Sequence, residues 1–348
     1  MKILYYTDVH WSQHSSIIRS RDEYYSTRLD NLIRSVNWAE EQAAYFGCSS
    51  VIIGGDFFDS SQLNAEEVSA LQNIRWAPIS HVFITGNHET TTSNLEYSTA
   101  DLFNLCPNSV VINKAEQYII DSNTEFCFLP YVLERDRKRL IEYFPNRLAT
   151  QRIIFSHNDL KDVNYGGFIS KEGFELNDID NSCELFINGH IHHCAKVTSK
   201  IINGGNLTGQ NFTEDASKYD HCALIIDTDN LSVQFIVNPY AFNFYKLDLT
   251  NLDNDTAVIN KLGTLKHNAV ITVTVNQNIA QTVRTILENY NKSLIREYRV
   301  IVQHSMSNIT EKIQEFDTVD HLKQFENYVL TNIGTSDVVR EELSMVMR

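Results

Sequence analysis

The feature that most constrains the fold is a short β-branched run that ends in two glycines and an aspartate. Val51–Ile53 is apolar throughout, which is typical of a strand buried on both faces of a sheet. Gly54 and Gly55 then stop the run and let the backbone turn sharply, because glycine has no Cβ to clash. Asp56 is therefore predicted at the carboxyl end of this strand, where open α/β sheets place their ligands.

Four other segments repeat this layout, in which a β-like run ends in side chains that carry oxygen or imidazole donors. One such segment alone would be interpreted as a turn, but five in one chain are hard to produce by chance. His190 and His192 are two residues apart, so on an extended segment both side chains point the same way. The four segments are Asp8-Val9-His10, Gly86-Asn87-His88, Ser156-His157 and Gly189-His190-Ile191-His192.

The donor atoms of these segments predict a metal centre. Oxygen and imidazole donors without a thiolate suit Mn²⁺, Fe²⁺ or Zn²⁺ and argue against an iron–sulfur cluster. A single ion could not use so many groups, so we expect two ions roughly 3.5–4 Å apart that share a bridging carboxylate. Asp56 is central in the set and is the predicted bridge. Mn²⁺ is the expected metal, with Mg²⁺, Fe²⁺ or Zn²⁺ as alternatives.

The pattern along residues 1–240 predicts one α/β domain. Residues 29–46 repeat apolar side chains at helical spacing, and this helix leads back from a strand at 2–7 to the strand at 51–53. Such a βαβ unit implies a parallel sheet. Further predicted helices are 64–71, 99–105 and 135–143, further predicted strands are 82–84, 110–112, 118–120, 126–129, 152–155 and 185–187, and antiparallel ribbons are predicted at 197–202, 223–227 and 233–237.

The pattern changes past Pro239. Residues 269–275, 279–290 and 298–303 predict a strand, a helix and a strand, and this small α+β domain, 241–310, carries no candidate ligand cluster. Residues 318–348 predict a helical tail. Short helices are marginal in water, so we expect the tail to pack on its own domain or to bind a partner. Its two apolar stripes are Leu322, Phe325, Val329 and Leu330, and Val338, Val339, Leu343 and Val346.

Composition and charge narrow the function classes. The formal net charge of -15 disfavours a general nucleic-acid coat, because nonspecific affinity comes from Lys and Arg. It does not exclude a metal-dependent nuclease, whose ions offset carboxylates locally.

The six cysteines form no CxxC pair, which indicates buried thiols, and Cys194 is not expected to be a ligand. No run of about 18 apolar residues occurs and the N-terminus enters a strand at once, so we expect a cytoplasmic protein without a membrane span.

The motifs DxH, GDxxD, GNH, a lone histidine and GHxH, in this order, resemble those of the calcineurin-like metallophosphoesterase superfamily. Within it, the chain is most similar to SbcD-type DNA-repair nuclease subunits and their phage counterparts. The resemblance covers roughly the first 210 residues. It implies an α/β fold with a four-layer αββα core, in which two packed mixed β-sheets are flanked by helices. It also implies a small α+β cap domain that contacts DNA and a C-terminal helical tail.

The resemblance further implies a role for each site residue. His88 would be the catalytic imidazole, placed to donate to the departing oxygen or to stabilise charge on the phosphate. Asp59 stands where many relatives carry a second active-site histidine, and as a catalytic acid it would need a raised pKa. For His157, a satisfied core histidine is the alternative. One ion would bind Asp8, His10, Asp56 and His192, and the other would bind Asp56, Asn87, His157 and His190.

The metal motifs alone do not choose the phosphoester. Phosphoprotein phosphatases carry an arginine after the bridging aspartate loop, whereas this chain has Asp59-Ser60-Ser61. Purple acid phosphatases need a tyrosine at the position of Asp59. The Gly204-Gly205-Asn206 turn, the α+β unit and the tail favour a DNA nuclease subunit that cuts as an exonuclease or an endonuclease.

Its partners would be DNA, as single strands or duplex ends, and an SMC-like ATPase. In that assembly, two copies of this chain would form a homodimer within a heterotetramer. The alternative is a stand-alone metallophosphatase or small-molecule phosphodiesterase. A metal-free scaffold is disfavoured, because every predicted ligand position is filled.

Overall fold

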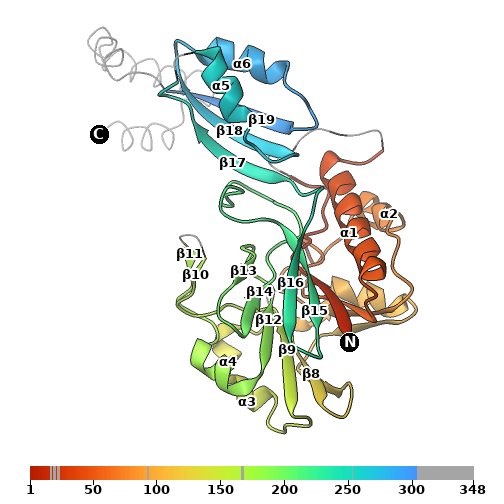
Figure 1. Cartoon of the computed structure of the whole chain (residues 1–348). Coiled ribbons are helices and arrows are strands. Elements are labelled where there is room, and N and C mark those ends of the chain that lie inside the picture. Colours follow the sequence, from red (N-terminus) through yellow and green to blue (C-terminus); the bar gives the residue numbers. More distant parts are fainter. Residues whose placement is uncertain are drawn as a thin grey trace, which may run out of the picture. The chain divides into compact units, whose positions relative to one another are not determined.

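The computed structural model contains two six-stranded mixed sheets, both in the larger of its two compact units (Figure 1). The structure describes residues 1–303 except 16–17, 19–20, 22–23, 92–93, 166–167 and 253, so the predicted tail, 318–348, lies outside the described residues. The described chain divides into two compact units. The larger unit has residues 1–247, 261–272 and 290–299, and the smaller has 248–260, 273–289 and, of the described residues, 300–303.

The first sheet has the order β16-β15-β1-β2-β3-β6. Strands β1, β2, β3 and β6 run parallel, β15 pairs antiparallel with β1, and β16 pairs antiparallel with β15. The predicted βαβ unit and the two C-terminal strands of this sheet are therefore confirmed. Its strands are β1 (Lys2–Tyr6), β2 (Ser50–Ile53), β3 (Ser80–Ile84), β6 (Ser109–Ile112), β15 (Cys222–Asp227) and β16 (Ser232–Val237).

The second sheet has the order β13-β14-β12-β9-β8-β7. Strands β8, β9, β12 and β14 run parallel, whereas β7 and β13 are antiparallel edge strands. Its strands are β7 (Glu116–Ile119), β8 (Thr124–Leu129), β9 (Gln151–Ser156), β12 (Leu185–Asn188), β13 (Ala195–Lys196) and β14 (Ile201–Asn203).

Apolar side chains pack the two sheets face to face and cover their outer faces with helices. Between the sheets, the ring of Tyr5 stacks on Phe155 with centroids 6.1 Å apart, inside one continuous buried cluster. Helices α1 (Thr27–Tyr45) and α2 (Ala65–Leu71) pack on the outer face of the first sheet. Helices α3 (Leu140–Tyr143) and α4 (Leu176–Ser182) pack on the outer face of the second. The predicted αββα order of layers is thereby confirmed.

The remaining elements are short or follow the two sheets. Strands β17 (Asn243–Asp248), β18 (Ala269–Asn276) and β19 (Ile295–Gln303) form a three-stranded sheet, with α5 (Asp255–Leu262) and α6 (Ala280–Glu288) in the connections. None of the helices in the described part of the chain is long and apolar enough to span a bilayer. The short elements are β4 (Thr90–Thr91), β5 (Asn94–Ser98), β10 (Asn164–Tyr165), β11 (Phe168–Ile169) and the 3-10 helices η1 (Thr99–Leu105) and η2 (Glu134–Asp136).

One predicted element was wrong and another was only partly right. The single helix at 135–143 is instead η2 and α3, separated by an extended stretch. Arg137 holds that stretch in place, because its guanidinium bonds Glu134 and Asn158 and lies 4.7 Å above the ring of Phe174. The ribbon predicted at 197–202 is partly confirmed, because β13 and β14 pair antiparallel across a turn at 197–200, but β14 also pairs parallel with β12. The sequence analysis also missed α4, β17 and α5.

Candidate metal centre

Five loops that follow parallel strands bring the predicted site residues together. Three overlapping groups have ligand atoms within 4.8 Å of one another, and Asp56 and His10 each belong to two of these groups. The side-chain oxygen of Asn87 lies 2.9 Å from Nδ1 of His190 and so joins the same cluster. The groups are Asp8, His10 and His192; His10, Asp56 and His88; and Asp56, His157 and His190.

Four of these residues have a left-handed backbone. The φ angles are 51° at Asp8, 50° at His10, 48° at Asp56 and 75° at His190, values that side chains other than glycine rarely adopt. Such backbone strain costs about 1–3 kcal/mol per residue and persists where surrounding structure enforces it. Here the N–H of Asp8 donates to the carbonyl of Gly55, and the N–H of His10 donates to the carbonyl of Asp56. The β1 and β2 loops therefore hold each other in the turned conformation.

A glycine is required where the β3 loop approaches the β2 loop. A Cβ added at Gly86 would lie 2.1 Å from Oδ1 of Asp56, which no side chain can tolerate. The same oxygen accepts a hydrogen bond from the N–H of His88 at 2.9 Å. The glycine of the GNH motif thus lets the loop that carries Asn87 and His88 close onto the predicted bridging carboxylate.

The donor atoms of the first predicted ion site face one another. His10 Nε2 lies 3.1 Å from His192 Nε2 and 3.9 Å from Asp8 Oδ1. Asp56 Oδ2 lies 4.0 Å from the same nitrogen of His10. When several ligand atoms bind one ion at about 2.0–2.2 Å, their distances from one another are close to the separations seen here. These four side chains can therefore hold one cation with small adjustments.

The second predicted ion site combines Asp56 with the β3, β9 and β12 loops. His157 Nδ1 donates to the carbonyl oxygen of Gly54 at 2.7 Å, so its Nε2 carries the lone pair when the ring is neutral. That Nε2 lies 3.0 Å from Asp56 Oδ2, so in the neutral form two lone-pair atoms face each other. A proton or a cation between them resolves the repulsion. The satisfied core histidine considered as the alternative for His157 is therefore disfavoured.

Two buried atoms of the cluster lack a hydrogen-bond partner when the ring of His157 is neutral. They are Oδ1 of Asp8 and Nε2 of His157, one in each predicted ion site. A buried polar atom without a partner costs about 1–3 kcal/mol, so native structures keep few of them. Both atoms are metal donors, and both face the other members of their groups. The residues present therefore fit two divalent cations.

The charge of the cluster favours cations as well. Burial by itself would lower the pKa of His10, but hydrogen bonds to Asp59 and Asp8 and the charge of Asp56 raise that pKa to about 10. Burial would likewise lower the pKa of His157, but the charges of Asp56 and Asp8 raise it to about 9. The buried carboxylates thus draw positive charge into the site, and bound metal ions would supply that charge.

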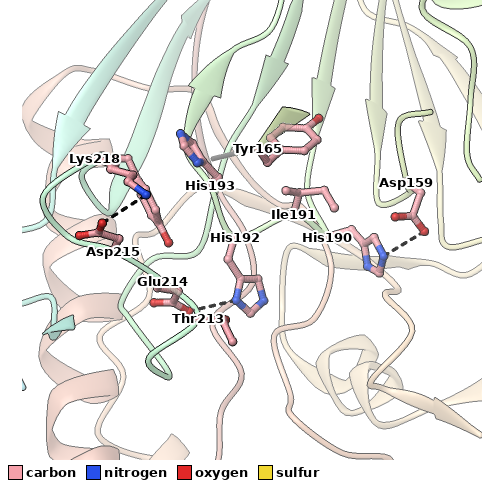
Figure 2. Close-up of a pocket in the computed structure, with 11 residues that line it drawn as sticks. Asp159, Tyr165, His190, Ile191, His192, His193, Thr213, Glu214, Asp215 and Lys218 are labelled. Carbon is pink, nitrogen blue, oxygen red and sulfur yellow. Dashed lines mark hydrogen bonds and ion pairs between the residues drawn. The ribbon is translucent and has the colours of Figure 1, made fainter. Parts of the chain in front are cut away.

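Each predicted imidazole ligand is oriented through its other ring nitrogen. Besides the bond from His157 to Gly54, His10 Nδ1 lies 2.9 Å from Oδ1 of Asp59. His192 Nδ1 lies 3.2 Å from Glu214 Oε1, and His190 Nε2 lies 3.3 Å from Asp159 Oδ2 (Figure 2). An oxygen at the remote nitrogen fixes the ring and the tautomer of a metal-bound histidine. The sequence analysis missed Glu214 and Asp159.

The contacts of Asp59 and His88 separate their predicted roles. Burial opposes ionisation of Asp59, but the hydrogen bond and charge of His10 lower its pKa, so Asp59 is ionised at neutral pH. It is thus suited to orient His10 and not to donate a proton. His88 Nδ1 donates to the carbonyl oxygen of Asp59 at 3.1 Å, and 42% of its side chain is exposed. Its Nε2 is therefore the nitrogen available to a substrate.

Glu89 is a further residue that the sequence analysis did not assign. Its Oε1 accepts hydrogen bonds from the N–H groups of Phe57 and Phe58, and its Oε2 accepts one from Gly86. Burial raises the pKa of Glu89 to about 7. Glu89 thus ties the β2 loop to the β3 loop beside Asp56. The only signal in the sequence was its place directly after GNH.

Replacing the shared carboxylate tests the assignment of the metal centre. Asp56→Ala should remove bound metal from both predicted sites, because Asp56 Oδ2 lies beside the donor atoms of each. Metal content after gel filtration in Mn²⁺, measured by elemental analysis, should fall from two ions to fewer than one. Two tightly bound ions in Asp56→Ala would contradict the bridge.

Replacing the carboxylate behind His192 tests its orienting role. Glu214→Ala should weaken Mn²⁺ binding about 10–100-fold, the usual cost of losing a partner behind a metal ligand. Glu214→Gln should recover most of the affinity, because its amide oxygen can still accept from His192. Isothermal titration of Mn²⁺ measures this, with Asp215→Ala as the control for the same loop. Equal affinity in Glu214→Ala and the control would reject the role.

The model of a known protein family matches the part of the sequence that carries this site. The model described as calcineurin-like phosphoesterase matches residues 1–194, a span that includes every predicted ligand from Asp8 to His192. No curated protein matches the chain.

Solved structures of low sequence identity also match the chain. A dimetal phosphatase from Danio rerio shares 13% identity over 68% of this chain and 99% of its own, with a TM-score of 0.39. The protein TT1561 of Thermus thermophilus shares 9% over 68% and 98%, with a TM-score of 0.41. The calcineurin-like phosphoesterase YfkN from Bacillus subtilis shares 11% over 68% and 88%, with a TM-score of 0.37. On the family model, which covers more than half of its length, the chain belongs to the calcineurin-like phosphoesterases, a family of metal-dependent phosphoester hydrolases.

Proposed function

We propose that the chain is a metal-dependent DNA nuclease that hydrolyses phosphodiester bonds as the nuclease subunit of an SbcCD-like repair or recombination complex. The observation that favours a phosphodiester substrate over a monoester is the charge of the residues beside the metal centre. A cavity of about 440 Å³ is lined by His190 and His192, and Lys218 is the single lysine or arginine among its lining residues. Lys218 is itself paired with Asp215 at 3.4 Å.

This charge disfavours a phosphate monoester. A monoester dianion is usually held by a cationic clamp, most effectively a bidentate arginine. The loop after Asp59 continues with Ser60 and Ser61 and offers no arginine for that purpose. A phosphodiester carries only one negative charge, so the two metal ions can balance it without further cations. The order of the metal motifs, which resembles that of SbcD-type nucleases, supports DNA as the diester.

The residues of the site have defined tasks in such a reaction. Two divalent ions, when bound, stabilise both the attacking and the leaving oxygen of an in-line displacement at phosphorus. Asp56 would hold both ions, and the remaining carboxylate, amide and imidazole ligands would fix their positions. His88, oriented by its bond to the carbonyl of Asp59, would donate a proton or a hydrogen bond through Nε2 to the departing oxygen.

A stand-alone metallophosphatase or small-molecule phosphodiesterase is the second candidate. The observation that favours it is the charge of the whole chain, which is formally -15 and gives little nonspecific attraction to DNA. In the first proposal, this attraction would come from the metal ions and from the ATPase partner. Substrate preference distinguishes the two candidates directly.

Cleavage of DNA in the presence of Mn²⁺ tests the proposal. The purified protein should cut end-labelled single-stranded or duplex DNA and should hydrolyse an aryl phosphate monoester poorly. His88→Ala should keep both metal ions and cut about 10²–10⁴-fold more slowly, the usual worth of general acid–base help. A contaminating nuclease would not respond to this substitution. Fast monoester hydrolysis with no DNA cleavage would establish the second candidate instead.

Removing the predicted tail tests the proposed partner. Its two apolar stripes suit a groove or a coiled-coil surface of an SMC-like ATPase. Deletion from Thr318 onward should leave Mn²⁺-dependent cleavage of single-stranded DNA largely intact. It should abolish co-purification with the ATPase and any ATP-stimulated action on duplex ends. A truncated protein that melts several degrees lower but still binds the ATPase would assign the tail to the fold of its own chain.

A further inference from the structure

The residues that line the cavity beside the metal centre include two chemically different groups. One group is His190 and His192, which belong to the predicted metal centre. The other group is His193 and Tyr219, which the metal-dependent reaction described above does not use. The volume of about 440 Å³ is within the range of about 300–1,000 Å³ typical of small-ligand sites. A group attached to a phosphate at the metal centre can therefore enter this space.

His193 and Tyr219 form an aromatic part of the cavity lining. The rings of His193 and Tyr219 stack with their centroids 4.4 Å apart and their planes 24° from parallel. Tyr165 lies beside His193 at 6.3 Å, and His221 meets Tyr219 edge-on at 5.6 Å. The flanking rings fix the stacked pair in one orientation. His193 and Tyr219 are only partly buried and both line the cavity, so they offer a preformed aromatic surface to a ligand.

The charges of the cavity exclude a second phosphate. Its lining has three carboxylates, Asp159, Glu214 and Asp215, against one lysine, Lys218. Each carboxylate already has a partner, because Asp159 and Glu214 orient metal ligands and Asp215 pairs with Lys218. A further anion would therefore meet net negative charge and no free cation of the lining. An uncharged flat group, by contrast, loses little solvation and gains contact with the rings.

We propose that this cavity binds the nucleobase of a nucleotide joined to the scissile phosphate, against the stacked pair of His193 and Tyr219. The inference rests on the proposed function, because it names the part of the DNA substrate that the site recognises. Stacking on an aromatic ring accepts every base, since every base has a π-face. The site would thus select nucleotides over other phosphodiesters without selecting a sequence.

Four small chromogenic diesters test the cavity separately from the nuclease activity. Two are the 5′- and 3′-(p-nitrophenyl phosphate) esters of thymidine, and two are the matching esters of the abasic tetrahydrofuran analogue. Within each pair the leaving group and the phosphate are the same, and only the base differs. With Mn²⁺, the wild type should prefer the thymidine ester of at least one pair about 5–100-fold in kcat/KM, the range expected for one stacked base.

Substitutions at Tyr219 should change this preference and not the basal rate. Tyr219→Leu should bring the ratio of thymidine to abasic kcat/KM close to one and leave the abasic rate unchanged. Tyr219→Phe, which keeps the ring, should retain the preference. Tyr45→Ala is the matched surface control, because Tyr45 is 80% exposed at the end of α1, next to the amino end of β2. The ratio within one preparation does not depend on the fraction of folded enzyme, so partial misfolding cannot imitate the result.

The outcomes distinguish the cavity from the proposed function. DNA cleavage by a wild type that shows no base preference, or a preference that Tyr219→Leu retains, overturns the nucleobase site and leaves the nuclease intact. Base preference without cleavage of oligonucleotides supports the nucleobase site and overturns the nuclease. Neither base preference nor oligonucleotide cleavage overturns both.

Discussion

The structure depends on a carboxylate, Asp56, held almost fully buried where the two sheets meet the solvent-facing loops. A buried negative charge is costly unless it is paired or binds a metal. The fold meets this requirement by bringing imidazoles from the β1, β9 and β12 loops around Asp56 and Asp8. Burial opposes ionisation of Asp56, but the charges of His157 and His10 hold its pKa well below the usual range. The loops around Asp56 thus place the groups that stabilise its buried negative charge.

Orientation is the second requirement, and oxygens behind the ligands provide it. Four predicted imidazole ligands each have a remote ring nitrogen within 3.3 Å of an oxygen atom. Two of these oxygens, on Gly54 and Asp59, lie in the β2 loop, and the other two belong to Asp159 and Glu214, which no motif includes. Glu214 also accepts hydrogen bonds from Asn206 and from the backbone of Gln210, so its loop is itself fixed. The ligands therefore need little rearrangement to bind metal, which is the condition for a well-defined two-ion site.

The cluster could be predicted from the sequence because its members share one local sequence pattern, which tertiary packing does not change. An apolar run followed by glycine and a ligand marks the end of a parallel strand, and the carboxyl ends of such strands meet. Glu89 and Asp159 lie on loops that carry motifs but at positions that the apolar runs do not mark, and Glu214 lies on a separate loop that only packing brings to the site. Local helical pattern failed at Arg137 for the same reason, because its bonds to distant residues decide the backbone there. The parallel direction of β14 depends on the turn at 197–200, which apolar spacing does not specify.

The acidic character of the chain and a nucleic-acid substrate are compatible once the site is considered as metal plus protein. The carboxylates that repel phosphate are also the groups that concentrate divalent cations, so binding of the metal changes the sign of the local field. Asp159 and Glu214 have two roles, because they orient His190 and His192 and also contribute negative charge to the neighbouring cavity. One phosphate is then favoured at the ions and additional phosphate is disfavoured beside them. If the proposed nuclease function holds, the same carboxylates would influence both where the diester binds and which uncharged part of it enters the cavity.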